Sequence, residues 1–128
     1  MSEKRILRIG IATRDEMKRR SIALAKGERK RHPDEPSVWF SSMESLGKVL
    51  SARNMLLLDI IRRAEPQSIS ELANESGRAK SNLSRTLKNL SEIGIVEMID
   101  GSERGRKTRA PRVRYDDFEL RGTLGAAA

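Results

Sequence analysis

The chain has 128 residues, enough for about one ordinary domain with an extension. It contains no cysteine, which excludes disulfides, thiolate zinc sites and thiol nucleophiles, and its aromatic content of 3% disfavours a large sandwich or barrel. The net charge of +8 indicates a polyanionic partner, and residues 78–114, with ten Lys or Arg against four Asp or Glu, carry six of these charges.

An N-terminal arm is indicated by residues 5–11, where apolar and polar side chains alternate as they do in a short strand. Thr13 is followed three residues later by Glu16, a capping-box pattern that predicts a helix beginning at residue 14. Gly27 predicts that this helix ends near residue 25. We therefore expect a strand-helix arm over residues 1–27 that serves dimerisation or binds a partner.

Residues 28–37 are strongly charged, include Pro33 and Pro36 and have no apolar period. Such a composition predicts a linker rather than a helix or a strand. It places the main domain over residues 38–121 and leaves residues 122–128 as a flexible tail.

Four helices are predicted between the linker and Gly94. Their expected positions are a short helix carrying Leu46 and Val49, and then residues 52–63, 71–76 and 78–93. Gly77 and Gly94 follow two of these helices and suit the left-handed conformation that often ends a helix. The last helix has the clearest amphipathic pattern, with Leu83, Leu87 and Leu90 on one side.

Residues 52–63 carry more apolar side chains than one buried stripe requires, since six of the twelve positions hold Leu, Ile or Met. This surplus predicts a helix that packs on two sides. Contact with a second copy of the chain would explain it, and burial within a single chain would explain it equally well.

A β-hairpin is predicted after the last helix. Residues 95–99 are a β-branched run, Asp100-Gly101 begins a turn region, and residues 112–115 return as the partner strand. Helices followed by a hairpin are the order of a winged helix-turn-helix. The expected fold class is mainly α with a small β-hairpin wing (α+β), a winged helix-turn-helix with an N-terminal strand-helix extension.

The helix over residues 78–93 is the predicted recognition helix, because its face opposite the three leucines is polar and basic. The candidate DNA-binding residues on this face are Arg78, Lys80, Ser81, Asn82, Ser84, Arg85 and Lys88. Arg pairs with guanine and Asn with adenine, whereas Lys mainly contacts phosphates. The first acid on this face is Glu92, which favours DNA binding over an ordinary solvated face.

Residues 101–111 are the predicted basic wing, a loop between the two hairpin strands. The candidate DNA-binding residues of the wing are Arg104, Arg106, Lys107 and Arg109. Cations beside a duplex release condensed counterions, so binding becomes salt-dependent and largely independent of base sequence. A disordered loop is the alternative interpretation.

Three segments carry a family resemblance in their order along the chain. They are Phe-Ser-Ser-Met-Glu-Ser-Leu at 40–46, Pro-Gln-Ser-Ile-Ser-Glu-Leu-Ala at 66–73 with Gly77-Arg78, and Asn-Leu-Ser-Arg-Thr-Leu-Lys-Asn-Leu at 82–90 with Gly94-Ile95-Val96. Over about residues 39–120 the chain resembles MarR-like winged-helix transcriptional regulators, and more closely a family of small archaeal and bacterial DNA-binding proteins. The resemblance implies a dimeric regulator, and some similar proteins are antitoxins.

The expected function is a sequence-specific, double-stranded DNA-binding transcriptional regulator, acting as a homodimeric autorepressor in the cytoplasm, associated with the nucleoid. The alternative is an antitoxin that binds a protein toxin through the arm and represses its own operon. No enzyme, cofactor, metal or membrane partner is expected, because acid–base pairs, metal-ligand spacings, phosphate loops and long apolar runs are missing. The four aromatic residues make single-stranded RNA a weaker candidate.

Overall fold

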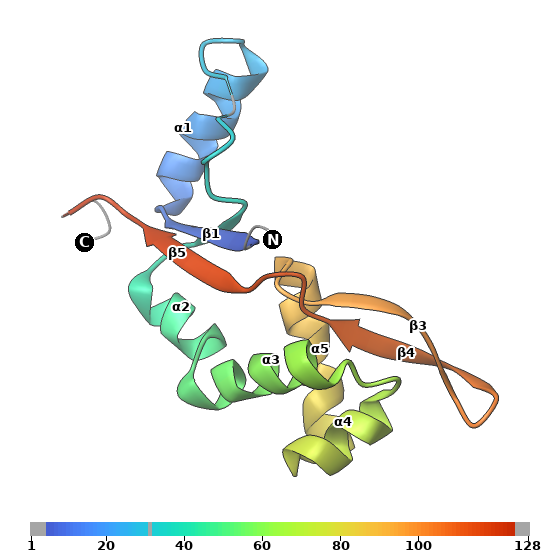
Figure 1. The fold of residues 1–128 in the computed structure, drawn as a ribbon. Helices are drawn as coiled ribbons and strands as arrows, with labels where there is room; N and C mark the ends of the chain where they lie inside the picture. Colours follow the sequence, from blue (N-terminus) through green and yellow to red (C-terminus); the bar gives the residue numbers. More distant parts are fainter. Residues whose placement is uncertain (1–4, 31, 125–128) are drawn as a thin grey trace. The chain divides into compact units, whose positions relative to one another are not determined.

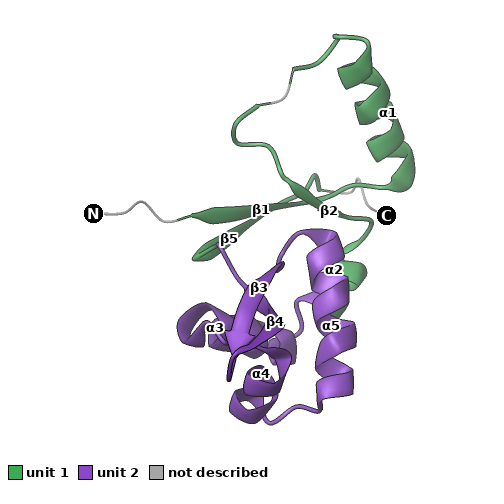
Figure 2. Ribbon diagram, turned by 90° about the vertical axis from the view of Figure 1, so that its right-hand side faces the viewer, with its two compact units in different colours: residues 1–48, 115–128 green, residues 49–114 purple. Residues whose placement is uncertain are grey.

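A computed structural model describes residues 5–30 and 32–124. Five helices and five strands lie within these residues, so the fold is mixed α and β. The chain divides into two compact units, residues 1–48 with 115–128 and residues 49–114 (Figure 2). These bounds differ from the sequence-based division, which placed residues 38–48 and 115–121 with the predicted DNA-binding domain.

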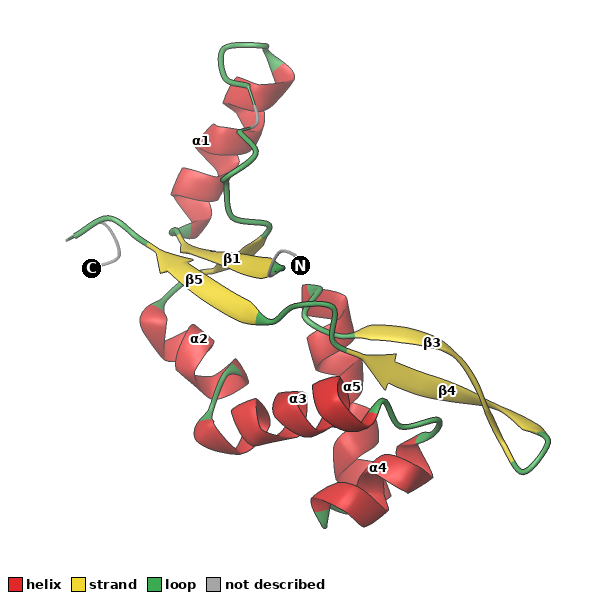
Figure 3. Ribbon diagram, in the orientation of Figure 1, coloured by secondary structure: helices red, strands yellow, loops and turns green. Residues whose placement is uncertain are grey.

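Three parallel strands form the sheet of the first unit (Figures 1 and 3). β1 (Ile6–Ile11) lies between β2 (Val38–Phe40) and β5 (Asp117–Arg121). α1 (Arg14–Ala25) is the crossover that two parallel strands require, here between β1 and β2. The strand and helix expected in the N-terminal arm are therefore confirmed, and the described part of residues 28–37 contains neither helix nor strand.

The two faces of β1 explain how the first unit is built. Leu7, Ile9 and Ile11 alternate along the strand and are all buried, as the apolar alternation predicted. Gly10 points to the opposite face, where a side chain at this position would collide with the indole of Trp39 and the ring of Pro36. The glycine therefore allows Trp39 to lie directly against the central strand.

The second unit contains three helices with clear local signals. They are α3 (Ala52–Ala64), α4 (Ile69–Ser76) and α5 (Lys80–Ile93), whereas α2 (Met43–Val49) belongs to the first unit except for its last residue. Ser51 and Ser68 cap α3 and α4, since each hydroxyl oxygen accepts a hydrogen bond from the backbone N–H three residues later. Gly77 and Gly94 end α4 and α5 at φ of 73° and 103°, values that favour glycine.

One apolar core holds the second unit together, and α4 packs against both α3 and α5. Its buried residues are Leu57, Ile61, Leu72, Leu83, Leu87, Leu90, Ile95, Val96 and Ala110. Burial of α3 on two sides within the single chain is wrong, because Leu56 is 67% exposed and Met55 is 37% exposed. Packing of this second side against another copy of the chain stays a prediction. A single stripe through Leu57 and Ile61 faces the core.

The hairpin is longer than the sequence predicted. β3 (Glu97–Glu103) pairs antiparallel with β4 (Arg106–Arg112), from Glu97 opposite Arg112 to Glu103 opposite Arg106. Arg104 and Gly105 form the turn, both with positive φ, as a tight two-residue hairpin turn requires. The prediction of a loop over 101–111 with a return strand at 112–115 is therefore wrong. Most of residues 101–111 belong to the two strands.

Among the described residues, no helix is long and apolar enough to cross a membrane.

Candidate nucleic-acid interface

α5 presents a polar, basic face away from the core. Leu83, Leu87 and Leu90 are buried on its inner side, as the helical spacing predicted. The exposed candidates on the outer side are Lys80, Ser81, Ser84, Arg85 and Lys88. Because these side chains leave one helix in the same general direction, the face offers donors over more than two turns without an acid before Glu92.

Arg78 and Asn82 are only half-exposed, because they belong to a network inside the second unit. Arg78 Nε and Nη2 donate to Asn82 Oδ1 at 2.9 and 2.7 Å, and Nη2 also donates to Thr86 Oγ1 at 3.1 Å. Arg78 Nη1 donates to Asn54 Oδ1 at 3.1 Å, and Asn54 Nδ2 donates to Val49 O at 2.9 Å. The guanidinium thus connects the first turns of α5 to α3.

This network changes what each predicted side chain can offer a ligand. Arg78 already points its donors at three oxygens, and its burial, together with repulsion from Arg53, lowers the pKa of its guanidinium. The Oδ1 atom of Asn82 is also occupied, but its amide NH₂ group remains able to donate. Within the predicted basic face, Arg78 is therefore held by hydrogen bonds inside the unit, and it orients the amide of Asn82. Arg85 and Lys88 lie farther along α5.

The hairpin positions the other four candidates. Arg104 lies in the turn, and Arg106, Lys107 and Arg109 lie on β4, all four exposed. Arg109 Nη1 is 2.8 Å from Asp100 Oδ1 on the neighbouring strand, and Arg109 Nη2 donates to Met98 O at 3.2 Å. Arg109 is therefore held along the hairpin, while Arg104 and Lys107 have no ion pair among the described residues.

The hairpin is attached to the segment between α3 and α4. Thr108 Oγ1 donates to Gln67 O, and Ser68 Oγ donates to a carboxylate oxygen of Glu103. Arg112, which is buried, donates from Nη1 to Pro66 O at 2.6 Å. These contacts hold the hairpin beside the start of α4 along its length, from Arg112 at its open end to Glu103 next to the turn. The sequence analysis could not predict them, because their partners lie 35 to 46 residues apart.

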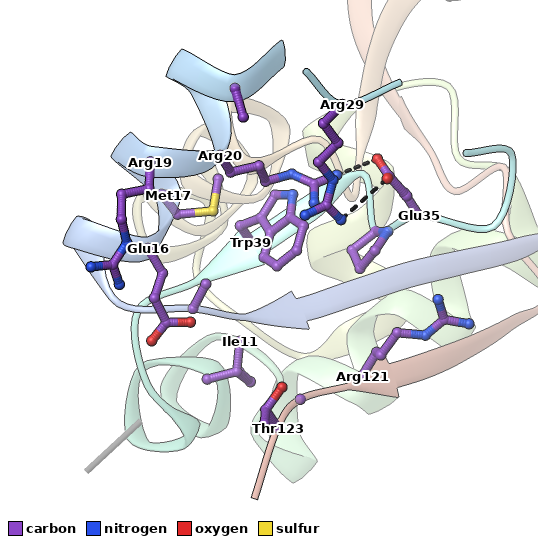
Figure 4. A pocket seen from close by; sticks show the side chains of 14 residues that line it. Ile11, Glu16, Met17, Arg19, Arg20, Arg29, Glu35, Trp39, Arg121 and Thr123 are labelled. Atoms are coloured by element: carbon purple, nitrogen blue, oxygen red, sulfur yellow. Dashed lines mark hydrogen bonds and ion pairs between the residues drawn. The ribbon is translucent and has the colours of Figure 1, made fainter. Parts of the chain in front are cut away.

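A separate cavity of about 520 Å³ lies in the first unit (Figure 4). The indole of Trp39 lines it, and the Arg20 guanidinium carbon is 4.9 Å from the ring centroid. Glu35 accepts from Arg20 and, at 3.4 Å, from Arg29. Burial raises the pKa of Glu35, but the two arginines outweigh it and hold that pKa below the ordinary value. These opposite charges compensate one another inside the unit.

The described residues hold no group of three or more His, Cys, Asp or Glu that could bind a metal ion. Arg20, Glu35 and Trp39 were not among the site residues predicted from the sequence. Trp39, the single tryptophan of the chain, was the one feature of the sequence that could have indicated this cavity. The ion pair between Arg20 and Glu35 leaves no local sequence pattern, because the two residues are 15 positions apart.

A family comparison covers the whole second unit. Residues 49–120 match the HVO_A0114 family, more than half of the chain. The chain belongs to the HVO_A0114 family. The matched region contains α5, the hairpin and almost all of β5, whereas residues 1–48 of this HVO_A0114 protein lie outside it.

The chain is also similar to the LexA repressor of Polaromonas sp. (strain JS666), with 32% identity over 81 residues. That similarity covers 59% of this chain and 35% of the repressor, so the chain spans about a third of the relative's length. No solved structure matches this HVO_A0114 protein.

Replacing Gly101 by alanine is expected to displace the hairpin of this HVO_A0114 protein. A Cβ at Gly101 would lie 2.5 Å from Gln67 O and 2.8 Å from Thr108 Oγ1, and the first of these atoms belongs to the backbone. We expect a loss of about 1–3 kcal/mol in the free energy of unfolding, because overpacking forces the backbone to move. Urea denaturation measures it.

The matched control is Gly47→Ala in α2, where a Cβ would meet nothing within 4 Å. This exchange should leave stability unchanged or raise it slightly, because alanine favours helix. Equal midpoints for Gly101→Ala and the unaltered chain would contradict the close approach of Gln67 to the hairpin.

Proposed function

We propose that the protein is a sequence-specific, double-stranded DNA-binding transcriptional regulator. In this proposal the second unit is a winged helix-turn-helix, with α4 and α5 as its two helices, α5 as the recognition helix, and the β3–β4 hairpin as the wing. The observation that carries it is the outer face of α5, where exposed Lys, Ser and Arg side chains lie together opposite a leucine stripe.

The chemistry of that face supports base reading by its exposed Arg. Arg85 has no ion pair or side-chain hydrogen bond among the described residues, so its guanidinium is available to pair with a guanine edge. Asn82 would donate to a base from its amide nitrogen, while Arg78 holds the Asn82 side chain in position. Ser81 and Ser84 suit base edges or phosphates, and Lys80 and Lys88 suit phosphates.

The wing would contribute affinity more than sequence preference. Arg104, Arg106 and Lys107 lie in or beside the turn of a hairpin that is held at Thr108 by Gln67 and at Glu103 by Ser68. Such cations approach phosphates and release counterions, and this gain depends little on the bases. The similarity to a protein named LexA repressor supports a regulator of transcription.

In more detail, we propose that the protein acts as a homodimer and represses transcription from its own promoter. A two-fold dimer would place two copies of α5 in successive major grooves, about 34 Å apart. The MarR-like resemblance and the antitoxin role, with a toxin held by the arm, stay predictions.

The test is a binding titration of the purified full chain with its own upstream DNA and with a scrambled duplex of equal length, across several salt concentrations. We expect the upstream duplex to bind about 4 kcal/mol or more tighter, which is the usual margin of specific over non-specific sites. Equal affinity for both duplexes would overturn sequence-specific regulation, and absence of binding at low salt would overturn DNA binding altogether.

A wing variant separates affinity from specificity in the same assay. Lys107→Ala should weaken both duplexes similarly and reduce the slope of log K against log salt by about 1. The control is Arg63→Ala on α3, which also removes one charge, but whose guanidinium lies 2.6 Å from Asp59 Oδ2. A loss for Lys107→Ala confined to the upstream duplex would contradict the phosphate role.

A further inference from the structure

β5 is an edge strand of the three-stranded sheet, with β1 as its one neighbour among the described residues. Asp117 N donates to Arg5 O at 3.3 Å, on the side of β1. Because backbone groups of successive strand residues point to opposite sides, those of Phe118 and Leu120 point to the outer edge. An outer edge of this kind is a template for another strand.

The same two residues carry exposed apolar side chains. Phe118 is 48% exposed and Leu120 is 42% exposed. Their partners in the register of β1 are Leu7 and Ile9, which are 4% and 0% exposed. The buried apolar face of the sheet therefore continues onto β5, where it meets solvent.

The sequence Asp-Phe-Glu-Leu-Arg is complementary to its own reverse. In an antiparallel pair of β5 strands centred on Glu119, Asp117 lies opposite Arg121 of the second copy, and Phe118 lies opposite Leu120. Two-fold symmetry repeats each pair, so the interface contains two opposite-charge pairs and two apolar pairs. This self-complementarity identifies a second copy of the chain as the partner.

The remaining pair places Glu119 opposite Glu119, and a neighbouring cation compensates for it. Arg8 Nε lies 3.7 Å from Glu119 Oε2 within each chain. That Nε atom is buried and has no hydrogen-bond partner among the described residues. The guanidinium thus brings positive charge to the one position where the two strands would repel each other.

We propose that the protein dimerises by antiparallel pairing of the two β5 strands, which joins two three-stranded sheets into one sheet of six strands. The proposal deepens the dimer assumed in the proposed function by naming its interface. It places the contact on β5, in the first unit.

A charge-exchange cycle on the full chain tests the pairing, with the dimer dissociation constant measured by sedimentation in the absence of DNA. Asp117→Arg alone and Arg121→Asp alone each create two like-charge pairs per dimer, so each should weaken the dimer about tenfold. The dissociation constant of the double variant should return to within about threefold of that of the unaltered chain, because both opposite-charge pairs form again with the two charges exchanged. Lys30→Asp is the control for a charge change elsewhere in the first unit and should have no effect.

A cross-link tests the register directly. The chain has no cysteine, and Glu119 faces its own copy at a position where Cα atoms are about 4.5 Å apart, close enough for a disulfide. Glu119→Cys should therefore form a disulfide-linked dimer on mild oxidation, whereas Lys30→Cys should not. Circular dichroism of every variant confirms that it is folded.

Three outcomes overturn the proposal: a monomer at all concentrations, a dimer that is unchanged by both single charge variants, or a double variant as weak as the single ones. Failure of the proposed function is distinguishable from these. A dimer with the expected cycle that binds no duplex overturns DNA binding alone, and a monomer that prefers its upstream duplex overturns the interface alone.

Discussion

Leu87→Ala is expected to lower the free energy of unfolding by about 2–5 kcal/mol, the largest stability effect expected of any change considered. Leu87 lies in the middle of α5 and is 1% exposed. The exchange removes buried apolar surface and leaves a cavity between α5 and the rest of the second unit, and both effects act in the same direction. Equilibrium denaturation in urea measures the change through the transition midpoint.

Asn89→Ala is the matched control, because Asn89 lies on the same helix but is exposed. It should change stability by no more than about 0.5 kcal/mol, as surface exchanges usually do. A stable Leu87→Ala protein with a destabilised Asn89→Ala protein would mean that α5 is rotated about its axis. The outer face would then contain different residues, so this measurement also examines the candidate interface.

The helices of the second unit could be predicted because their signals are local. Leu83, Leu87 and Leu90 recur at helical spacing, and Gly77 and Gly94 mark helix ends by a conformation that glycine adopts without strain. The same spacing predicted the exposed side of α5. The hairpin was predicted too short, because Gly101 and Pro111 disfavour strands in isolation.

The parts that could not be predicted depend on residues far apart in the sequence. Gln67 approaches β3 closely at Gly101, where there is no Cβ to collide with it, and β5 pairs with β1 across more than 100 residues. Arg78 was expected on the outer face, yet an acceptor on α3, Asn54, draws its guanidinium inward. Helical spacing gives the direction in which a side chain leaves the backbone, but it does not tell which partners a long side chain will reach.

Arg85→Ala is expected to cost about 1–3 kcal/mol in binding to the cognate duplex and to relax the preference at one base pair. Arg85 is exposed on α5 and carries no ion pair within the described chain, so its donors are free to form a bidentate pair with guanine. Competition binding against duplexes with single base changes measures both effects. The cognate duplex should lose affinity, while duplexes already altered at that base pair should lose little.

Arg85→Lys distinguishes base reading from simple attraction. Lysine keeps the charge but cannot form the planar bidentate pair, so the salt dependence should remain while the preference for the cognate base falls. If Arg85 contacted only phosphate, Arg85→Lys would bind every duplex nearly as the unaltered chain does, and Arg85→Ala would weaken all duplexes alike, as expected for Lys107→Ala. Sequence reading would then have to come from Asn82 and the serines of the same face, because these are the remaining side chains there that can distinguish base edges.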